Sequence, residues 1–207
     1  MEPIVNKYTL PDAAILDSPD EYSYKVWQPD KLYAVLGRAN NIDDSLITGN
    51  ITKDNVTVLK RPSGGEAVIL SPRMLVISAK MKFYKEMNTK QIFNRINTLL
   101  IDRLSALGIK GLYSRGISDL SINDRKILGS SMYLNKDVIF YHAVLNISED
   151  VSLLSKYLKH PTREPDYRKG RSHLEFVTSI HKEGYPFTSR ELSSVLTLAL
   201  QQILFSK

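Results

Sequence analysis

The chain has 207 residues, of which 43% are hydrophobic and 24% charged, a composition typical of a globular protein that buries its own core. It contains no cysteine, which excludes disulfides, cysteine-ligated zinc and a thiol nucleophile. The net charge of +6 is compatible with nucleic acid, a nucleotide, an acidic protein partner or plain solubility, so charge alone decides nothing.

The sequence shows no signal for export or membrane insertion. Its first residues, MEPIVNKYTLPDAA, lack a basic start followed by an apolar core, and no apolar run approaches the ~20 residues that span a bilayer. We therefore expect a cytoplasmic protein that contacts no membrane. The densest basic cluster, REPDYRKGR at 163–171, carries its own acids, and no nucleic-acid-binding motif accompanies it. We expect no nucleic-acid partner.

The N-terminal part of the chain alternates between short apolar runs and turn residues, which predicts strands. Pro29-Asp30 is expected to join the first two strands, and Gly64-Gly65 and Ser71-Pro72 to separate later ones. The expected strands cover 22–28, 31–37, 56–60, 66–70 and 73–81.

A helix is predicted for 89–106, where apolar side chains recur with a 3.6-residue period. Asn88 or Thr89 can cap its start, and Gly108 is placed to end it.

The rest of the chain returns to strands and ends in a helix. The last helix is predicted to start at a capping box of Thr188 and Glu191 and to run to about Leu204. Between the two long helices we expect strands at 120–123, 126–134 and 138–147 and a short helix at 149–159. Strands in blocks, with helices between the blocks, predict the α+β class: a mixed, largely antiparallel sheet with flanking helices, in a single domain over residues 1–207.

Two short segments carry residues suited to chemistry. RPSGGEAV at 61–68 places two adjacent glycines between expected strands; taken alone it is typical of a tight turn, although it also fits a backbone cradle for an anion. In SDLSINDRKILGSSMY at 118–133, Asp119 is expected to end one strand and Lys126 to open another. Taken alone, such a lysine is typical of a solvated surface.

Four segments together resemble a known family in their order and spacing. They are VLGRANNI (35–42), KRPSGGEAV (60–68), DLSINDRKILGSS (119–131) and FYHAVLNI (140–147). They resemble the catalytic domain shared by biotin and lipoate protein ligases, and most closely the lipoate–protein ligases. The resemblance covers about residues 10 to 180. At this length the chain is similar to a short form without the C-terminal accessory domain that many members carry.

The resemblance implies a site that holds an acyl-adenylate, the mixed anhydride of a fatty acid and AMP. It implies that Lys126 is catalytic, contacting the acyl carboxyl and phosphate oxygens, and that Asp119 has a role connected with Mg²⁺. For His142, a packed structural histidine is as consistent with the sequence as a functional one. The acyl-adenylate-binding residues implied by the resemblance are Arg61, Ser63, Gly64, Gly65, Ala67, Gly129, Ser130 and His142.

The activity implied is that of a lipoate–protein ligase or transferase. It moves a lipoyl or octanoyl group from an acyl-adenylate to a lysine of a lipoyl carrier domain, in a 2-oxoacid dehydrogenase or a glycine-cleavage H-type protein. The implied cofactors and substrates are ATP or acyl-AMP, Mg²⁺, and lipoic or octanoic acid, and a separate accessory protein is an expected partner. The absence of cysteine excludes the thioester route used by related octanoyltransferases.

Some residues depart from the family pattern. Glu66 stands in place of a third glycine, and Leu70-Ser71 in place of a His-Asp pair. These departures keep open a non-catalytic relative that binds an acyl-nucleotide or carrier domain as a partner subunit. A biotin–protein ligase is a further alternative, although Gly129-Ser130-Ser131 resembles the lipoate branch.

Overall fold

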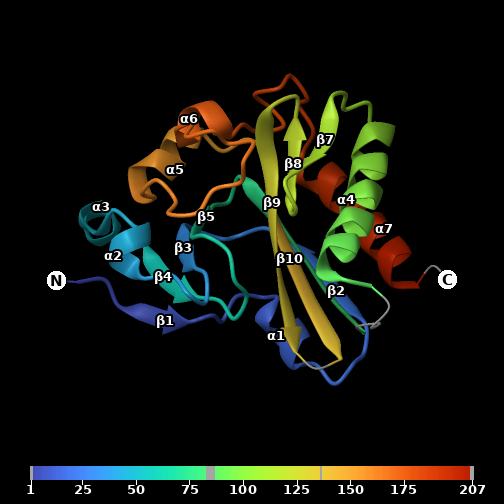
Figure 1. The fold of residues 1–207 in the computed structure, drawn as a ribbon, viewed down its shortest axis with the longest axis horizontal. Coiled ribbons are helices and arrows are strands. Elements are labelled where there is room, and N and C mark those ends of the chain that lie inside the picture. The colour runs from blue at the N-terminus through green and yellow to red at the C-terminus, as the bar shows by residue number, and fades with distance from the viewer. Residues whose placement is uncertain (1, 83–86, 136, 206–207) are drawn as a thin grey trace.

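The computed structural model describes residues 2–82, 87–135 and 137–205. Within these residues the strands form two sheets that lie side by side, and the helices pack around them (Figure 1). The smaller sheet runs in the order β1 (Val5–Lys7), β4 (Thr57–Lys60), β3 (Tyr33–Leu36), β5 (Val68–Leu70). Its first three strands are parallel, and β5 is antiparallel to β3. This sheet is therefore mixed.

The larger sheet is antiparallel throughout. Its strand order is β2 (Ser23–Trp27), β6 (Met74–Lys82), β10 (Val138–Asn146), β9 (Arg125–Asn135), β8 (Asp119–Ile122), β7 (Leu112–Arg115). The central strands β6 and β10 pair along their whole length, from Val138 opposite Lys82 to Asn146 opposite Met74.

Two long helices, α4 (Thr89–Ala106) and α7 (Ser189–Phe205), lie together on one face of the larger sheet (Figure 1). Their buried stripes, which include Ile96, Leu100, Leu196 and Leu200, pack on apolar side chains of that sheet and form the main core. The remaining helices are short: α1 (Ala13–Asp17), α2 (Ile42–Ser45), α3 (Thr48–Lys53), α5 (Val151–Tyr157) and α6 (His173–Phe176). None of the helices in the described residues combines the length and apolarity needed to cross a membrane.

A second layer of apolar side chains joins the two sheets. One buried cluster contains Val35 and Leu70 of the smaller sheet and Trp27 and Val76 of the larger sheet. Tyr8 from the N-terminal segment belongs to it as well. The facing strands are thus fixed relative to each other by burial, which contributes roughly 25 cal/mol for each Å² of apolar surface removed from water. This layer positions the site described below.

The predicted class is confirmed: the fold is α+β, mixed and largely antiparallel, although its strands divide into two sheets. The capping predictions also hold. Asn88 and Gln91 form a capping box at the start of α4, and Gly108, with φ +93°, follows its end. At α7, Thr188 Oγ1 accepts from the backbone N–H of Glu191 at 3.2 Å.

Pro29-Asp30 lies between two strands, as expected, but these strands belong to different sheets: β2 joins the larger sheet and β3 the smaller one, because the chain crosses between sheets here. One local prediction is wrong. Asp119 does not end a strand but begins β8, since the β7–β8 turn, with Gly116 at φ +57°, comes before it. The short elements β1, β7, α1, α2, α3 and α6 were not predicted.

Candidate active site

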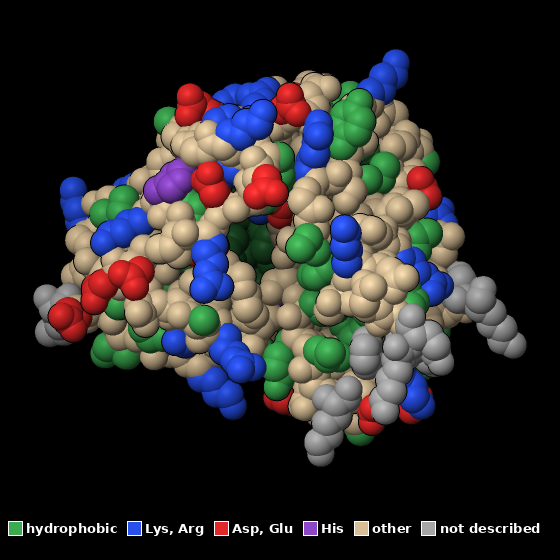
Figure 2. All heavy atoms as spheres, in the orientation of Figure 1, with side chains coloured by type: hydrophobic (Ala, Val, Ile, Leu, Met, Phe, Trp, Pro, Cys, Tyr) green, Lys and Arg blue, Asp and Glu red, His purple; other side chains and the backbone are tan. Residues whose placement is uncertain are grey.

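A cavity of about 560 Å³ lies between the two sheets. Its volume is within the range of roughly 300–1,000 Å³ that is usual for small-molecule sites. Figure 2 shows the opening on this face of the molecule, with hydrophobic side chains visible inside it. The apolar part of its wall comes from β3, β5, β6 and β10, through side chains such as Val35, Leu70, Val76 and Val144.

The other part of the wall is charged. It is built by β8, β9 and the segment after α5, and the whole lining holds five Lys or Arg residues and three Asp or Glu residues. These residues are Arg61, Lys126, Lys159, Arg163, Arg168, Glu66, Asp119 and Asp166. A cavity with an apolar part and a cationic part fits a molecule that has an apolar tail and an anionic head.

The glycine loop, residues 61–66, is wrapped around one buried guanidinium. Arg61 is 6% exposed and donates to Ser63 Oγ at 3.1 Å, Val35 O at 3.2 Å, and the carbonyl oxygens of Gly64 and Glu66 at 2.7 and 2.8 Å. Burial lowers the pKa of Arg61 to about 10, so it remains charged at neutral pH. Its hydrogen bonds set the shape of the loop, and this role accounts for its burial.

Two glycines allow this shape. Gly65 has φ +85°, a backbone region that residues with a Cβ rarely adopt. Its carbonyl oxygen lies where a Cβ on Gly37 would be, at 1.9 Å from that position. The hydrogen bonds Arg38 N to Ser63 O, 2.9 Å, and Arg61 N to Leu36 O, 3.0 Å, join the two segments. The glycine at 37 is required because the loop packs directly on its backbone.

A buried polar network supports the loop from behind. Ser63 Oγ contacts His142 Nε2, and His142 Nδ1 lies 3.9 Å from Asp12 Oδ2. Asp12 is fully buried and accepts from Tyr8 Oη and Ser78 Oγ, each at 2.8 Å. Because Ser63 Oγ already accepts from an arginine, its own proton is available to His142, whose Nδ1–H then faces Asp12.

Protonation in this network follows from its burial. Desolvation lowers the pKa of His142; the nearby Asp12 carboxylate opposes this shift and the Arg61 charge adds to it. Burial first, and Asp12 second, raise the pKa of Tyr8. His142 is therefore neutral and Tyr8 a hydroxyl donor at neutral pH, as the hydrogen-bond directions above require.

Lys126 reaches the cavity through an irregularity in the sheet. Leu120 pairs with Leu128 but Ser121 pairs with Lys126, so Ile127 is an extra residue on β9. Such a bulge re-aims the neighbouring side chain. A Cβ on Gly129 would lie 2.7 Å from Lys126 Cε and Nζ, so the lysine side chain lies directly over this glycine.

The Lys126 ammonium is held by one carboxylate. Its Nζ lies 2.8 Å from Asp119 Oδ1, and the lysine and aspartate side chains are 28% and 8% exposed. Tyr167 Oη donates to the other oxygen, Asp119 Oδ2, at 2.8 Å. A lysine carries three donors, and Asp119 is the only polar partner of Nζ within the described part of the chain. The remaining donors are available to a ligand in the cavity.

The charged part of the wall disfavours a further cation. The pKa of His173 is lowered to about 4, first by desolvation and then by the charges of Arg168, His160 and Lys126. The same surroundings favour an anion, and phosphate is the anion that paired lysines and arginines commonly bind. Among the residues described, no three His, Asp or Glu side chains are grouped to hold a metal ion. Magnesium is commonly bound by one or two carboxylates and substrate phosphates, which needs no such group.

Comparison with known proteins identifies the family. The model of the "Lipoyl protein ligase A/B catalytic domain" family matches residues 14–201. The chain belongs to this family. The structure is similar to a bi-partite lipoate protein ligase from Thermoplasma acidophilum at TM-score 0.80 and 20% identity, over 98% of this chain and 84% of that one. It is also similar to a lipoate-protein ligase A bound with ATP, at TM-score 0.78 and 18% identity, over 98% and 85% of the two chains.

A third similar structure is LipL1 from P. falciparum in complex with lipoate. Its TM-score is 0.69 at 22% identity, over 89% of this chain and 50% of that one. At these identities the similarity establishes the fold. The family match confirms the expectation of a lipoate ligase-like catalytic domain.

The structure brings most of the predicted site residues together. Ser63, fully buried, and Gly64, at the surface, belong to the glycine loop itself. The predicted residues that line the cavity are Arg61, Gly65, Ala67, Asp119, Lys126, Gly129, Ser130 and His142. Their functional roles remain predictions.

Sequence reasoning missed several residues of the site. Gly37 lies within the VLGR segment that carried the resemblance, and that motif is the signal that could have identified it. Asp12, Tyr8 and Tyr167 have no such signal. They reach the site from segments that are distant in sequence, such as Asp12 with Ser78, 66 residues apart.

Proposed function

We propose that the protein transfers a lipoyl or octanoyl group from an acyl-adenylate to a lysine of a lipoyl carrier domain. The observation that carries the proposal is the single cavity whose apolar wall continues into a cationic wall containing Lys126. An acyl-adenylate has this distribution of properties: a hydrocarbon chain, a central phosphate and a nucleoside. Membership of the lipoyl ligase family supports the choice of acyl group.

The acyl chain would lie along Val35, Leu70, Val76 and Val144, and its carboxyl carbon would lie near Lys126. The carrier lysine gives its ammonium proton to solvent, and its neutral amine nitrogen forms a bond to the acyl carbon and releases a second proton to solvent. The bond from that carbon to the phosphate oxygen then breaks, and AMP leaves. Negative charge grows on the carbonyl and phosphate oxygens during this step.

Lys126 is the residue placed to stabilise that charge. A preorganised cation at a developing oxyanion commonly contributes about 10²–10³ in rate. The ammonium is held by Asp119 and supported beneath by Gly129, so it needs no reorganisation when the charge forms. The glycine loop supplies a fixed backbone wall beside it, kept in shape by Arg61.

ATP and Mg²⁺ belong to the activation step that makes the adenylate. The cationic residues Lys159, Arg163 and Arg168 fit the phosphates of the nucleotide. Asp119 is the carboxylate available to a magnesium ion bound through those phosphates, but both of its oxygens have partners, Lys126 and Tyr167. We further propose that a separate accessory protein assists activation, since the similar T. acidophilum ligase is bi-partite.

The carrier domain is the proposed acceptor. The T. acidophilum ligase was studied with its E2 lipoyl domain, which makes a 2-oxoacid dehydrogenase carrier the first to test, and an H-type protein the second. The net charge of +6 favours an acidic partner and would accelerate encounter at low salt.

The test is the intact mass of an unmodified lipoyl domain after incubation with this protein and preformed lipoyl-adenylate. Wild type should add one lipoyl group per domain, and Lys126→Ala should reduce the rate at least about a hundredfold. A reaction without protein measures spontaneous acylation, and octanoyl- and biotinyl-adenylate report acyl choice. Addition no faster than the spontaneous rate would refute the transfer activity. Tight adenylate binding by that inactive protein would then indicate the non-catalytic relative.

A further inference from the structure

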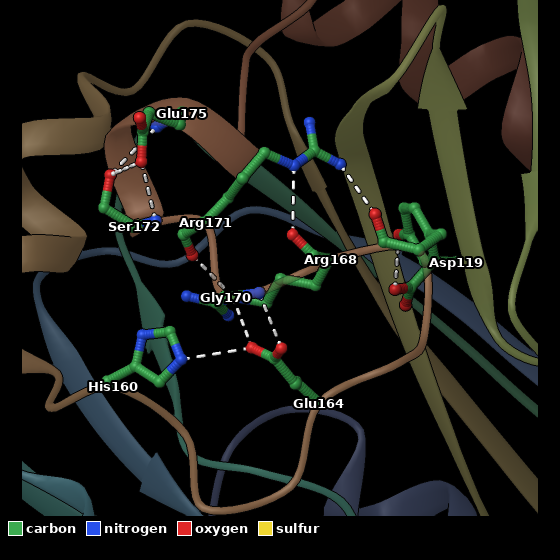
Figure 3. A network of polar contacts seen from close by, with 9 residues as sticks. Asp119, His160, Glu164, Arg168, Gly170, Arg171, Ser172 and Glu175 are labelled. Carbon is green, nitrogen blue, oxygen red and sulfur yellow. Dashed lines mark hydrogen bonds and ion pairs between the residues drawn. The ribbon is translucent and has the colours of Figure 1, made fainter.

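The segment 159–176, called here the strap, forms one wall of the cavity mouth and folds on itself. Glu164 is its centre: one carboxylate oxygen accepts from the Gly170 backbone N–H at 2.7 Å, and the other lies 3.1 Å from His160 Nε2 and 3.5 Å from Arg168 Nε (Figure 3). Lys169 and Gly170 both have positive φ, +53° and +71°, which makes the tight reversal between them and Glu164.

Arginine side chains close the strap. Arg171 donates to the carbonyl oxygens of Tyr167 at 2.9 Å and Arg168 at 3.1 Å (Figure 3). It also donates to Asp124 O at 3.1 Å. The guanidinium groups of Arg168 and Arg171 lie over the Phe176 ring, 4.9 and 5.2 Å from its centre. These contacts give the strap a defined shape without a ligand.

Tyr167 connects the strap to Lys126. Its hydroxyl donates to Asp119 Oδ2 at 2.8 Å, while Asp119 Oδ1 holds Lys126 Nζ at 2.8 Å. The tyrosine stays a donor at neutral pH, because burial and the Asp119 charge raise its pKa. Pro165 and Tyr167 also pack on the β7–β8 turn, 3.5 and 3.6 Å from where a Cβ on Gly116 would be. The hydroxyl is therefore fixed from several sides.

We propose that Tyr167 is a positioning residue for acyl transfer: its hydroxyl fixes the rotation of the Asp119 carboxylate, and Asp119 thereby fixes the Lys126 ammonium toward the cavity. This inference rests on the proposed function. A carboxylate with only one oxygen held can turn about its Cβ–Cγ bond, whereas two oppositely placed donors leave one orientation. The strap thus couples the shape of the cavity mouth to the placement of the charge that stabilises the reaction.

The experiment compares Tyr167→Phe with Tyr33→Phe, a matched control. Tyr33 donates to Asp30 Oδ1 at 2.7 Å, so the control deletes the same kind of tyrosine–aspartate bond outside the cavity lining. Kinetics of lipoyl transfer from lipoyl-adenylate should show a kcat lowered about tenfold for Tyr167→Phe, the effect of losing one hydrogen bond to a charged group, with KM for the adenylate changed less than about threefold. Tyr33→Phe should keep both values.

A second measurement needs no transfer activity. The proteins are treated briefly with an amine-acetylating reagent, and the modification of each lysine is measured by peptide mass spectrometry. Tyr167→Phe should accelerate acetylation of Lys126 by about threefold or more, because its ion pair loosens, while Lys156, paired with Asp54, serves as internal reference. Tyr33→Phe should change neither.

The two measurements separate the two proposals. Unchanged Lys126 acetylation in Tyr167→Phe would overturn the positioning role, as would a wild-type kcat in that variant. Faster Lys126 acetylation in Tyr167→Phe, together with no lipoyl transfer by the wild-type protein, would support the positioning of Lys126 by Tyr167 and refute the proposed function. A loss of kcat shared equally by Tyr33→Phe would identify a general structural effect and also overturn the inference.

Discussion

Replacing Gly37, which does not itself line the cavity, by alanine is expected to displace the glycine loop. The new Cβ would lie 1.9 Å from the Gly65 carbonyl oxygen and 2.8 Å from Asn40 Oδ1. Ordinary contact begins near 3.4 Å, so the two backbone segments must separate by about 1.5 Å. The Gly65 oxygen belongs to the backbone and cannot swing away, and the Asn40 side chain is held in place because its Oδ1 accepts from the Gly37 N–H at 2.8 Å.

The separation has an energetic cost and a functional one. Forced overpacking typically costs about 1–3 kcal/mol, and here it also stretches the Arg61 bonds to Gly64 and Glu66, so we expect roughly 2–3 kcal/mol. For a chain of this length, that lowers Tm by roughly 5–10 °C. The KM for acyl-adenylate should rise at least about tenfold, because the displaced loop forms part of the wall.

Urea unfolding followed by the fluorescence of the single tryptophan, Trp27, measures the stability, since this residue is buried between the sheets. Gly49→Ala is the matched control: a Cβ there meets nothing within 4 Å, and the residue lies in helix α3. It should be neutral or stabilising by up to about 1 kcal/mol. If Gly37→Ala unfolded within about 0.5 kcal/mol of wild type and kept its KM, the packing argument for the VLGR glycine would be wrong.

Three further predictions concern the buried site. Gly129→Ala should lower kcat for transfer at least about tenfold, because the new methyl displaces the end of Lys126. The loss of stability should stay below about 1 kcal/mol, because that end is flexible. Parallel kinetics and urea unfolding test both results. Asp12→Ala should cost at least about 2 kcal/mol in urea unfolding, because two buried hydroxyl donors lose their acceptor and His142 loses the neighbouring carboxylate, and Asp12→Asn should cost less. The free energy of unfolding should also fall on acidification below about pH 6.5, because the histidine of the unfolded chain gains a proton that buried His142 does not. The loss should reach up to about 1.4 kcal/mol per pH unit. His142→Gln should flatten this slope in urea titrations at pH 7.5 and 5.5, and an unchanged slope would contradict the lowered pKa of His142.

The parts of the fold that could be predicted are those with strong local signals. The 3.6-residue period and the Asn88 cap predict α4 as one continuous helix. The pair Thr188 and Glu191 predicts the start of α7. The partition of strands between two sheets has no local signal. Apolar runs predict that β2 and β3 are strands, but only the burial of Trp27 against Leu70 and Val76 in the layer between the sheets determines which neighbours each one has.

The candidate site likewise has one part that short sequence motifs predict and another part that they do not. Lys126, Gly129 and the glycine loop lie in short motifs whose order carries the family resemblance, and the structure places them around one cavity. The residues that hold them do not lie in those motifs. Tyr167 acts on Asp119 across 48 residues, and the bulge at Ile127 that aims Lys126 leaves no trace in the hydrophobic pattern.

Glu66, the main departure from the family pattern, is compatible with an intact cradle. Arg61 uses the Glu66 carbonyl oxygen, which every residue has, and not its side chain. Gly65, with φ +85°, is the position in the loop that requires glycine, whereas Glu66 is not among the residues with positive φ. Two glycines therefore suffice to form the loop, and the third position is free to carry a side chain.

The Leu70-Ser71 departure has a similar explanation. Leu70 is 2% exposed and lines the apolar wall between Trp27 and Val76, and Ser71 is fully buried at the turn between β5 and β6. A histidine at position 70 would bring a polar ring into that wall. An imidazole supports the loop from β10, that of His142, whose Nδ1 lies 3.9 Å from Asp12 Oδ2. The buried polar support of the cradle is thus supplied from the larger sheet, which leaves the wall contributed by β5 apolar for an acyl chain.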